Sequence, residues 1–157
     1  MDLKNNKRTA RVGLYAGSFD PFHIGHLDIV RQAQQVFDNV FVVRAINPDK
    51  SKASSPLPEK FLTEMNCVGV VTQEGLISDY IKGWEVQGYD VTLIRGLRSG
   101  ADLGYEQNLV AFLRNMHPQI KVVFFLCDPK YQHVSSSALR GIRQFSEEEY
   151  KKYAIGG

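Results

Sequence analysis

Short apolar runs alternate with helical patterns along this chain, and that alternation constrains its fold more than any other feature. The runs are rich in β-branched residues, as buried strands are, and they lie at Val12–Ala16, Val40–Ile46, Val68–Val71, Val91–Ile94 and Val122–Leu126. Between them, apolar side chains recur at helical spacing at Ile29, Ala33, Val36, Phe37, then at Ile77, Tyr80, Ile81, Trp84, and then at Tyr105, Leu109, Phe112, Leu113, Met116. Strands that alternate with helices form βαβ units, so we expect an α/β fold: a doubly wound, parallel five-stranded sheet with helices on both faces.

Size and composition indicate a single globular domain of 157 residues, in which residues 1–10 form a polar, flexible tail. The formal net charge of +2 gives no bulk electrostatic reason to expect a nucleic acid as partner. We expect no membrane partner either, because no apolar run reaches spanning length and the first residues lack the apolar region of a secretory signal. Cys67 and Cys127 lie far apart in apolar surroundings, which favours a reduced, cytoplasmic protein.

The segment Gly17–His26 follows the first apolar run and precedes an amphipathic one, in the order of a strand, a glycine turn and a helix N-terminus. Unpaired backbone N–H groups and a partial positive charge at a helix N-terminus attract phosphate. His23 and His26, in the expected first turn, add donors that can respond to charge developing on that phosphate. A plain turn, capped by Ser18 or Asp20, is the alternative. The pairing of two histidines around a glycine favours nucleotide chemistry.

Two arginines around a glycine end the fourth apolar run. Arg95 and Arg98 are suited to forked hydrogen bonds with phosphate oxygens. Asp102 and Glu106 follow at a spacing that also allows both arginines to form ordinary ion pairs, which is the alternative. Beside a first phosphate site, we favour phosphate binding.

Three serines at the end of Tyr131–Ser137 precede another apolar periodic run. They form either a simple helix N-cap or a second helix N-terminus whose hydroxyls hold a polyphosphate, with Tyr131 or His133 stacked on a base. Lys50 lies in the loop after the second run and is expected at the same edge of the sheet. No cluster of side chains has metal-ligand spacing, so we expect any metal to be Mg²⁺ carried by nucleotide phosphates.

Together these motifs resemble the nucleotidylyltransferase superfamily with its His-x-Gly-His signature, and within it the bacterial phosphopantetheine adenylyltransferase family. The resemblance covers residues 12–143 and rests on Gly17-Ser-Phe-Asp-Pro, Gly25-His26, Arg95-Gly-Leu-Arg98 with Asp102 and Tyr105-Glu106, and Val134-Ser-Ser-Ser137. It implies a Rossmann-like fold and an enzyme of coenzyme A biosynthesis. The implied reaction transfers AMP from ATP to 4′-phosphopantetheine, with Mg²⁺, and gives dephospho-coenzyme A and pyrophosphate by direct in-line attack without a covalent intermediate.

Carried over by position, the resemblance assigns catalysis to His26, which would stabilise the pentacoordinate transition state, and to Ser18, which would orient the acceptor phosphate. The acceptor would also contact Lys50 and Arg95 through its phosphate and Ile81 along the pantetheine channel. ATP would contact Ser18, Phe19, His26, Gly96, Leu97, Arg98, Glu106, Tyr131, Gln132, His133, Val134, Ser135, Ser136 and Ser137. The family further implies a homo-oligomer, in the form of a hexamer, and makes coenzyme A a candidate feedback ligand.

Two other functions stay open at this point. Arg140 fits the Ser-Ser-x-x-x-Arg ending of nicotinamide mononucleotide adenylyltransferases, so the acceptor could be nicotinamide or nicotinate mononucleotide. A nucleotide-binding sensor without turnover is the second alternative. Such a sensor would not need the transition-state contacts expected of Ser18, His26, Lys50, Arg95 and Arg98.

Overall fold

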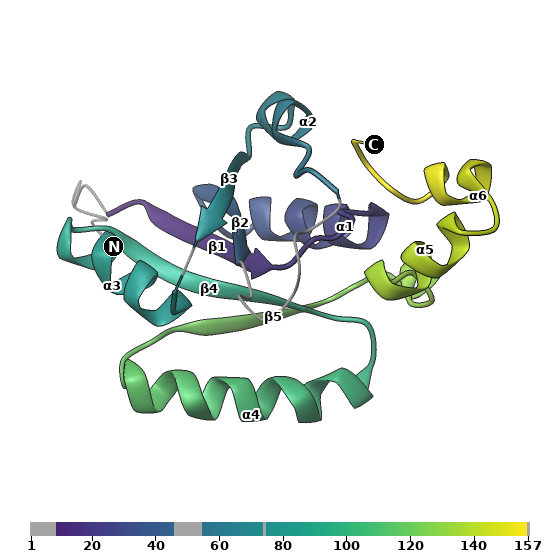
Figure 1. Ribbon diagram of the computed structural model, residues 1–157. Helices are drawn as coiled ribbons and strands as arrows, with labels where there is room; N and C mark the ends of the chain where they lie inside the picture. Colours follow the sequence, from purple (N-terminus) through teal and green to yellow (C-terminus); the bar gives the residue numbers. More distant parts are fainter. Residues whose placement is uncertain (1–8, 46–54, 74, 157) are drawn as a thin grey trace, which may run out of the picture.

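One parallel sheet organises the molecule (Figure 1). The computed structural model describes residues 9–45, 55–73 and 75–156, and the side chains of all of these except 70–73. Its five strands are β1 (Arg11–Gly17), β2 (Asn39–Ala45), β3 (Val68–Gln73), β4 (Asp90–Leu97) and β5 (Val122–Leu126). They pair in parallel in the order β3-β2-β1-β4-β5. The expected α/β fold with a five-stranded parallel sheet is therefore confirmed.

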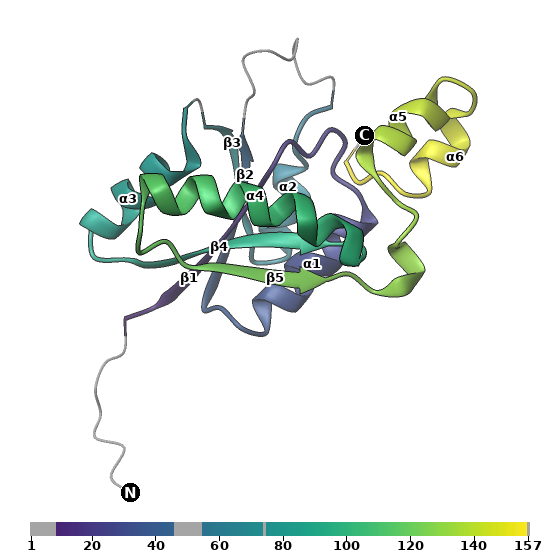
Figure 2. The ribbon, with the colours of Figure 1, turned by 90° about the horizontal axis from the view of Figure 1, so that it is seen from below.

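Helices cover both faces of this sheet, as the turned view shows (Figure 2). On one face, α1 (Ile24–Gln34) and α2 (Glu59–Glu64) pack on the sheet through apolar side chains such as Val30 and Leu62. On the other face, α3 (Ile77–Val86) and α4 (Gly100–Met116) contribute Ile81 and Leu113 to a second core cluster. Successive strand side chains point to opposite faces, so β1 supplies Tyr15 to the first cluster and its neighbours to the second.

The last part of the chain lies beyond the carboxyl ends of the strands (Figures 1 and 2). A short 3₁₀ helix (Pro129–Tyr131), α5 (Ser136–Arg143) and α6 (Glu147–Lys151) follow β5 there. A small apolar cluster of Val134, Leu139 and Tyr150 packs α5 and α6 together and contacts Ile24 at the start of α1. The chain then forms an antiparallel bridge between Ala154 and His23. These late residues therefore hold the segment that leads into α1.

Three local features differ from the sequence-based expectation. First, α1 ends at Gln34, so Val36 and Phe37 lie beyond it, although both have helical spacing. Second, α2 was not expected; it follows residues 47–58, a segment whose sequence is rich in Pro and Ser. Third, only Leu113 of the expected α4 stripe is fully buried, whereas Tyr105, Phe112 and Met116 are exposed. The expected tail at residues 1–10 falls almost entirely outside the described residues. No helix within the described ranges is long and apolar enough to cross a membrane.

Candidate active site

A cavity of about 200 Å³ opens where the carboxyl ends of β1 and β4 meet. Between these two strands the direction of winding reverses, because β1 leads towards β2 and β3 on one side and β4 pairs with β5 on the other. Such a reversal leaves a crevice in which ligands of parallel α/β proteins bind. The lining comes from β1, the first two turns of α1, the end of β4 and the chain from the end of β5 to the start of α5. It consists of Tyr15, His23, Gly25, His26, Ile29, Gly96, Leu97, Arg98, Cys127, Tyr131, Val134, Ser135 and Ser136.

The N-terminus of α1 is closed by a histidine rather than by Ser18 or Asp20. His23 is the N-cap residue, and its Nδ1 accepts hydrogen bonds from the backbone N–H of Gly25 at 3.1 Å and of His26 at 3.4 Å. In return, the backbone N–H of His23 donates to Nδ1 of His26 at 3.1 Å. This reciprocal arrangement is a capping box built from two imidazoles.

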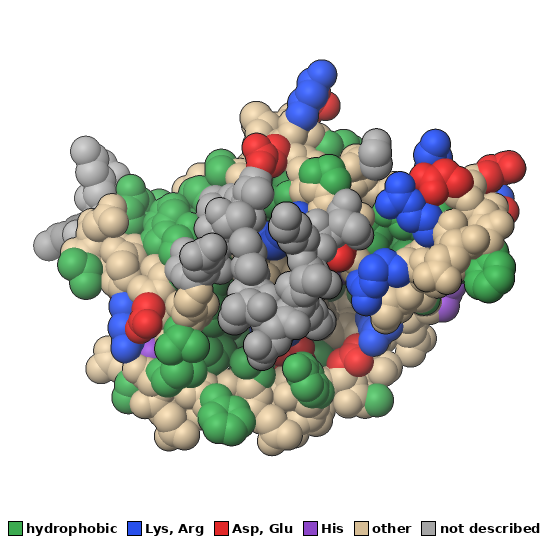
Figure 3. All heavy atoms as spheres, in the orientation of Figure 1, with side chains coloured by type: hydrophobic (Ala, Val, Ile, Leu, Met, Phe, Trp, Pro, Cys, Tyr) green, Lys and Arg blue, Asp and Glu red, His purple; other side chains and the backbone are tan. Residues whose placement is uncertain are grey.

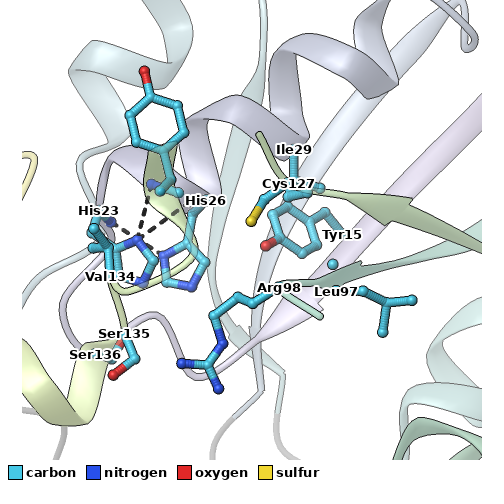
Figure 4. A pocket seen from close by; sticks show the side chains of 13 residues that line it. Tyr15, His23, His26, Ile29, Leu97, Arg98, Cys127, Val134, Ser135 and Ser136 are labelled. Carbon is cyan, nitrogen blue, oxygen red and sulfur yellow. Dashed lines mark hydrogen bonds between the residues drawn. The ribbon is translucent and has the colours of Figure 1, made fainter. Parts of the chain in front are cut away.

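The capping box fixes the orientation and the tautomer of His26. Because its Nδ1 accepts a hydrogen bond, the neutral ring carries its proton on Nε2, which is left to donate. Figure 4 shows the His26 ring facing the same cavity as Arg98, Ser135 and Ser136. The ring stacks on that of His23, with centroids 3.6 Å apart. A Cβ at position 25 would lie 3.0 Å from Cε1 of the His23 ring, so any residue other than glycine there would have to displace the ring by a few tenths of an ångström.

Burial keeps both imidazoles neutral near neutral pH. Burial, followed by the nearby charge of Arg98, lowers the pKa of His23 to about 4. The pKa of His26 is lowered well below its ordinary value, first by burial and then by His23 and Arg98. His26 is therefore a neutral hydrogen-bond donor pointing into a cavity that already contains an arginine, an arrangement that suits an anionic ligand.

The two arginines at the end of β4 have different environments. Arg98 lines the cavity and is half exposed; its Nε lies 3.4 Å from Asp102 Oδ2, and the same carboxylate accepts from the Arg98 backbone N–H at 2.9 Å. Arg95 is largely buried and forms a bidentate pair with Glu106, both bonds being 2.8 Å long. Its third bond goes to the carbonyl of Ala16 at 2.9 Å. Both ion pairs proposed as the alternative to phosphate binding are therefore formed in this structure.

The serines after the 3₁₀ helix serve structural roles as well as lining the cavity. Ser135 is the N-cap of α5, because its Oγ accepts from the backbone N–H of Ala138 at 3.1 Å. Ser136 donates from Oγ to the carbonyl of Pro21 at 2.9 Å, which ties α5 to the segment before α1. Ser135 therefore caps α5 and also lines the cavity together with Ser136.

Eight of the predicted site residues share this cavity, namely His26, Gly96, Leu97, Arg98, Tyr131, Val134, Ser135 and Ser136. The other described ones do not line it and are Ser18, Phe19, Ile81, Arg95, Glu106, Gln132, His133 and Ser137. Ser18 is exposed in the turn after β1, close to this edge of the sheet. Ile81 is fully buried in the core between α3 and the sheet. Lys50 lies outside the described residues, so its position stays a prediction.

The cavity also contains residues that the motifs did not point to. Ile29 lies one turn after His26 on the same face of α1, so its helical spacing was a usable signal. Cys127 directly follows β5, at the carboxyl edge where ligand-binding residues are expected, and its thiol is buried. Tyr15 sits within β1, and nothing in the apolar run distinguishes it from a core residue. Burial raises the pKa of its hydroxyl, so this group stays protonated.

Fold and site together define a nucleotidyltransferase: a parallel sheet with a neutral histidine donor at a helix N-terminus and an arginine across the same cavity. A family model described as cytidylyltransferase-like matches residues 14–142. Phosphopantetheine adenylyltransferase of Clostridium novyi (strain NT) is 36% identical over 140 residues, which cover 86% of this chain and 84% of that protein. The same enzyme of Streptococcus pyogenes serotype M5 (strain Manfredo) is 36% identical over 141 residues, 86% of this chain and 84% of that one. The chain thus belongs to the cytidylyltransferase-like family, in its phosphopantetheine adenylyltransferase branch.

Solved structures of similar fold include Plasmodium falciparum nicotinic acid mononucleotide adenylyltransferase complexed with NaAD. It has a TM-score of 0.61 at 17% identity, and the match covers 92% of this chain and 90% of that one. The bifunctional NMN adenylyltransferase/ADP ribose pyrophosphatase from Francisella tularensis has a TM-score of 0.56 at 12% identity, over 85% of this chain and 42% of that one. At such identities the likeness establishes the fold alone, so it does not choose an acceptor for this protein.

Proposed function

We propose that this protein is an adenylyltransferase that moves AMP from ATP to 4′-phosphopantetheine, giving dephospho-coenzyme A and pyrophosphate. The observation that carries the proposal is the neutral His26 ring, whose Nε2–H can donate into the cavity that Arg98 also lines. This cavity lies between β1 and β4, where the direction of winding reverses. The identity of 36% to curated phosphopantetheine adenylyltransferases over most of the chain supports the choice of acceptor.

In this reaction an oxygen of the acceptor phosphate forms a bond to the α-phosphorus of ATP, and the bond from that phosphorus to the pyrophosphate oxygen breaks. Negative charge spreads over the non-bridging oxygens of the α-phosphate as the centre becomes pentacoordinate. His26 donates from Nε2 to one of these oxygens, and no proton has to leave the ring. Arg98 and the N-terminus of α5 hold the remaining phosphates, with Ser135, Ser136 and Ser137 at that helix start.

The adenine moiety fits the apolar side of the cavity, where Leu97, Tyr131 and Val134 lie beside Gly96. The proposed ATP contacts also include Phe19, Glu106, Gln132 and His133, which do not line the cavity. Ser18 orients the acceptor phosphate from the turn after β1, and Lys50 and Arg95 bind it. Glu106 and the carbonyl of Ala16 accept from three of the five N–H donors of Arg95, so the second N–H of each terminal nitrogen can donate to the acceptor phosphate. Ile81 is retained as a channel residue of the proposal, which requires α3 to shift from its packed position.

Divalent metal enters the proposal with the nucleotide. Within the described ranges, no group of three or more His, Cys, Asp or Glu side chains is placed to hold a metal ion. Mg²⁺ commonly binds proteins through one or two carboxylates plus substrate phosphates, so ATP is its natural carrier here. When bound, it neutralises charge on the leaving pyrophosphate.

The decisive experiment incubates the protein with ATP, Mg²⁺ and one acceptor at a time, either 4′-phosphopantetheine or nicotinamide or nicotinate mononucleotide. Pyrophosphate release is measured, and the adenylylated product is identified by mass. We expect turnover with 4′-phosphopantetheine, and the His26→Ala variant serves as a matched background. Release with a pyridine mononucleotide and none with 4′-phosphopantetheine would overturn the assignment. Binding of ATP without turnover on any of these acceptors would instead indicate a sensor.

We further propose a homo-hexamer of single-domain protomers, acting in the cytoplasm, with coenzyme A as a feedback ligand of the same site. Exposed apolar side chains on α4 and β5, namely Tyr105, Phe112, Met116 and Leu126, support self-association; Figure 3 shows apolar side chains gathered over α4. The two free cysteines are consistent with a reducing compartment. Sedimentation gives the assembly, and competition of coenzyme A with ATP tests the feedback site.

A further inference from the structure

Arg44 is a buried cation that the proposed reaction does not use. It lies near the carboxyl end of β2, beside Gly17 of β1 in the sheet register, and only 6% of it is exposed. The strand residues just before it, Val42 and Val43, are fully buried core residues. Burying a guanidinium is unfavourable unless its donors are satisfied. Arg44 therefore needs hydrogen-bond acceptors within the protein.

Both described bonds of Arg44 go to the backbone of the turn after β1. Its Nε donates to the carbonyl of Ser18 at 2.9 Å, and its Nη2 donates to the carbonyl of Phe19 at 2.6 Å. Asp20, in the same turn, contributes a favourable charge to the guanidinium. A residue of β2 thus fixes the backbone of the turn that presents Ser18.

Phe19 transmits this restraint to His26. Its φ of +47° lies in the left-handed region, which a bulky residue adopts only when its surroundings impose it. In this conformation the Phe19 ring is buried and packs edge-on against the His26 ring, with centroids 4.9 Å apart at 90°. The bond from Arg44 to the Phe19 carbonyl holds the backbone that places this ring.

The rest of the turn is held in the same manner. The carbonyl of Asp20 accepts from Arg140 Nη1 at 2.6 Å, that of Pro21 from Ser136 Oγ, and that of Phe22 from the backbone N–H of Ile155. Five successive carbonyls, from residue 18 to residue 22, therefore bind donors from outside the turn. Arg44 supplies the two nearest to Ser18, and of the two arginines it is the buried one.

We propose that Arg44 is a positioning residue for catalysis, which sets the Ser18 backbone directly and the His26 ring through Phe19. The proposal rests on the proposed function, because it assigns Arg44 to the two residues on which adenylyl transfer depends. Small displacements of reacting groups are costly: a shift of about 1 Å can lower a rate about 10²-fold. Arg44→Ala should therefore lower kcat by about that factor and change the Kd of ATP by less than about twofold.

The test separates positioning from mere stability. Arg44→Ala is assayed at a temperature at which circular dichroism shows it folded, with and without guanidinium at a low millimolar concentration, and with equal NaCl as the ionic control. We expect guanidinium, but not NaCl, to restore at least about a tenth of the lost kcat, because it can occupy the vacated site and donate to the same carbonyls. Arg31→Ala, which removes an exposed arginine of α1, is the matched variant and should retain wild-type kcat.

A kcat of folded Arg44→Ala equal to that of Arg31→Ala, or a loss that guanidinium does not reverse, would overturn the proposal. Should the alanine variant not fold, Arg44→Met is used; it keeps an unbranched side chain of similar length but has no N–H donor, and wild-type kcat in it would equally overturn the proposal. Wild-type protein that adenylylates a different acceptor would refute the proposed function only, since the variants can be compared on that acceptor. Nitrogen-15 NMR of the His26 ring provides a readout without turnover: its signals should shift in Arg44→Ala and not in Arg31→Ala.

Discussion

Acid should destabilise this protein over a pH range that is set by His23, the N-cap residue of α1. His23 is buried, and its pKa is lowered from 6.5 to about 4, first by burial and then by the charge of Arg98. The unfolded chain binds a proton at His23 with the ordinary pKa, whereas the folded protein does so only near the lowered one. Between these two values the unfolded state binds more protons, so the free energy of unfolding falls as the pH falls.

The size of the effect follows from the width of that pH range. Each unit of pKa difference corresponds to about 1.4 kcal/mol, and at about pH 5 most of the unfolded chains but few of the folded ones are protonated at His23. The folded state therefore loses about 2 kcal/mol between about pH 8 and about pH 5 from this one residue. His26, with its pKa also lowered by burial, changes stability in the same direction.

Urea unfolding at the two pH values, for the wild type and for His23→Thr, isolates the contribution of His23. Threonine offers a hydroxyl oxygen that can cap the helix but has no proton to gain in this range. The wild type should lose about 2 kcal/mol more than His23→Thr between the two pH values, and groups whose pKa does not depend on His23 cancel in the comparison. Parallel losses in the two proteins would refute the reasoning, because they would mean that the folded protein accommodates a charged His23.

Four further outcomes follow from the site, the core and the surface. His26→Ala should lower kcat by about 10²–10³-fold with little change in the Kd of ATP, as measured by pyrophosphate release and calorimetry; an unchanged kcat would remove His26 from the mechanism. Arg95→Ala should raise the KM of the acceptor more than that of ATP, and equal increases would show that Arg95 binds a different phosphate. Gly13→Ala should lower the free energy of unfolding by about 1–3 kcal/mol, because its Cβ would lie 2.6 Å from Ile94 Cδ1. By contrast, Gly104→Ala, in open space on α4, should raise it by about 1 kcal/mol; similar denaturation midpoints for the two variants would contradict both values.

The sheet could be predicted from sequence because parallel strands covered on both faces appear as continuous apolar runs. The same rule explains the errors at helix ends. Phe37 has helical spacing, yet α1 stops at Gln34, and the Phe37 ring instead packs on the first core cluster. Local spacing cannot distinguish an apolar residue inside a helix from one that folds back on the same core. The short helix α2 was not predicted, because Leu62 is its one fully buried side chain and a single buried position defines no helical spacing.

The site was predictable to the extent that it is contiguous in sequence. His26, Arg98 and Ser135 lie in three local motifs, and the parallel topology brings the three together at one edge. Contacts between motifs could not be predicted in the same way. The bidentate pair of Arg95 and Glu106 was considered as an alternative, but its burial depends on how α4 packs across β4. The role of Arg44 could not be predicted, because a single arginine at the end of an apolar strand is typical of a strand end exposed to solvent.

Positions 23 and 26 of the signature therefore need different chemical groups. What His23 provides to α1 is one acceptor atom and one backbone N–H, and serine or threonine can supply both. What His26 provides is an Nε2–H aimed into the cavity while its own Nδ1 is held, and only an imidazole has both nitrogens at that separation. Variation at position 23 should then change stability and its pH dependence, whereas variation at position 26 should change turnover. The helix start fixes the tautomer of the His26 ring through a backbone bond, so the side chain of His23 can vary while Nε2 of His26 keeps the proton that the proposed reaction uses.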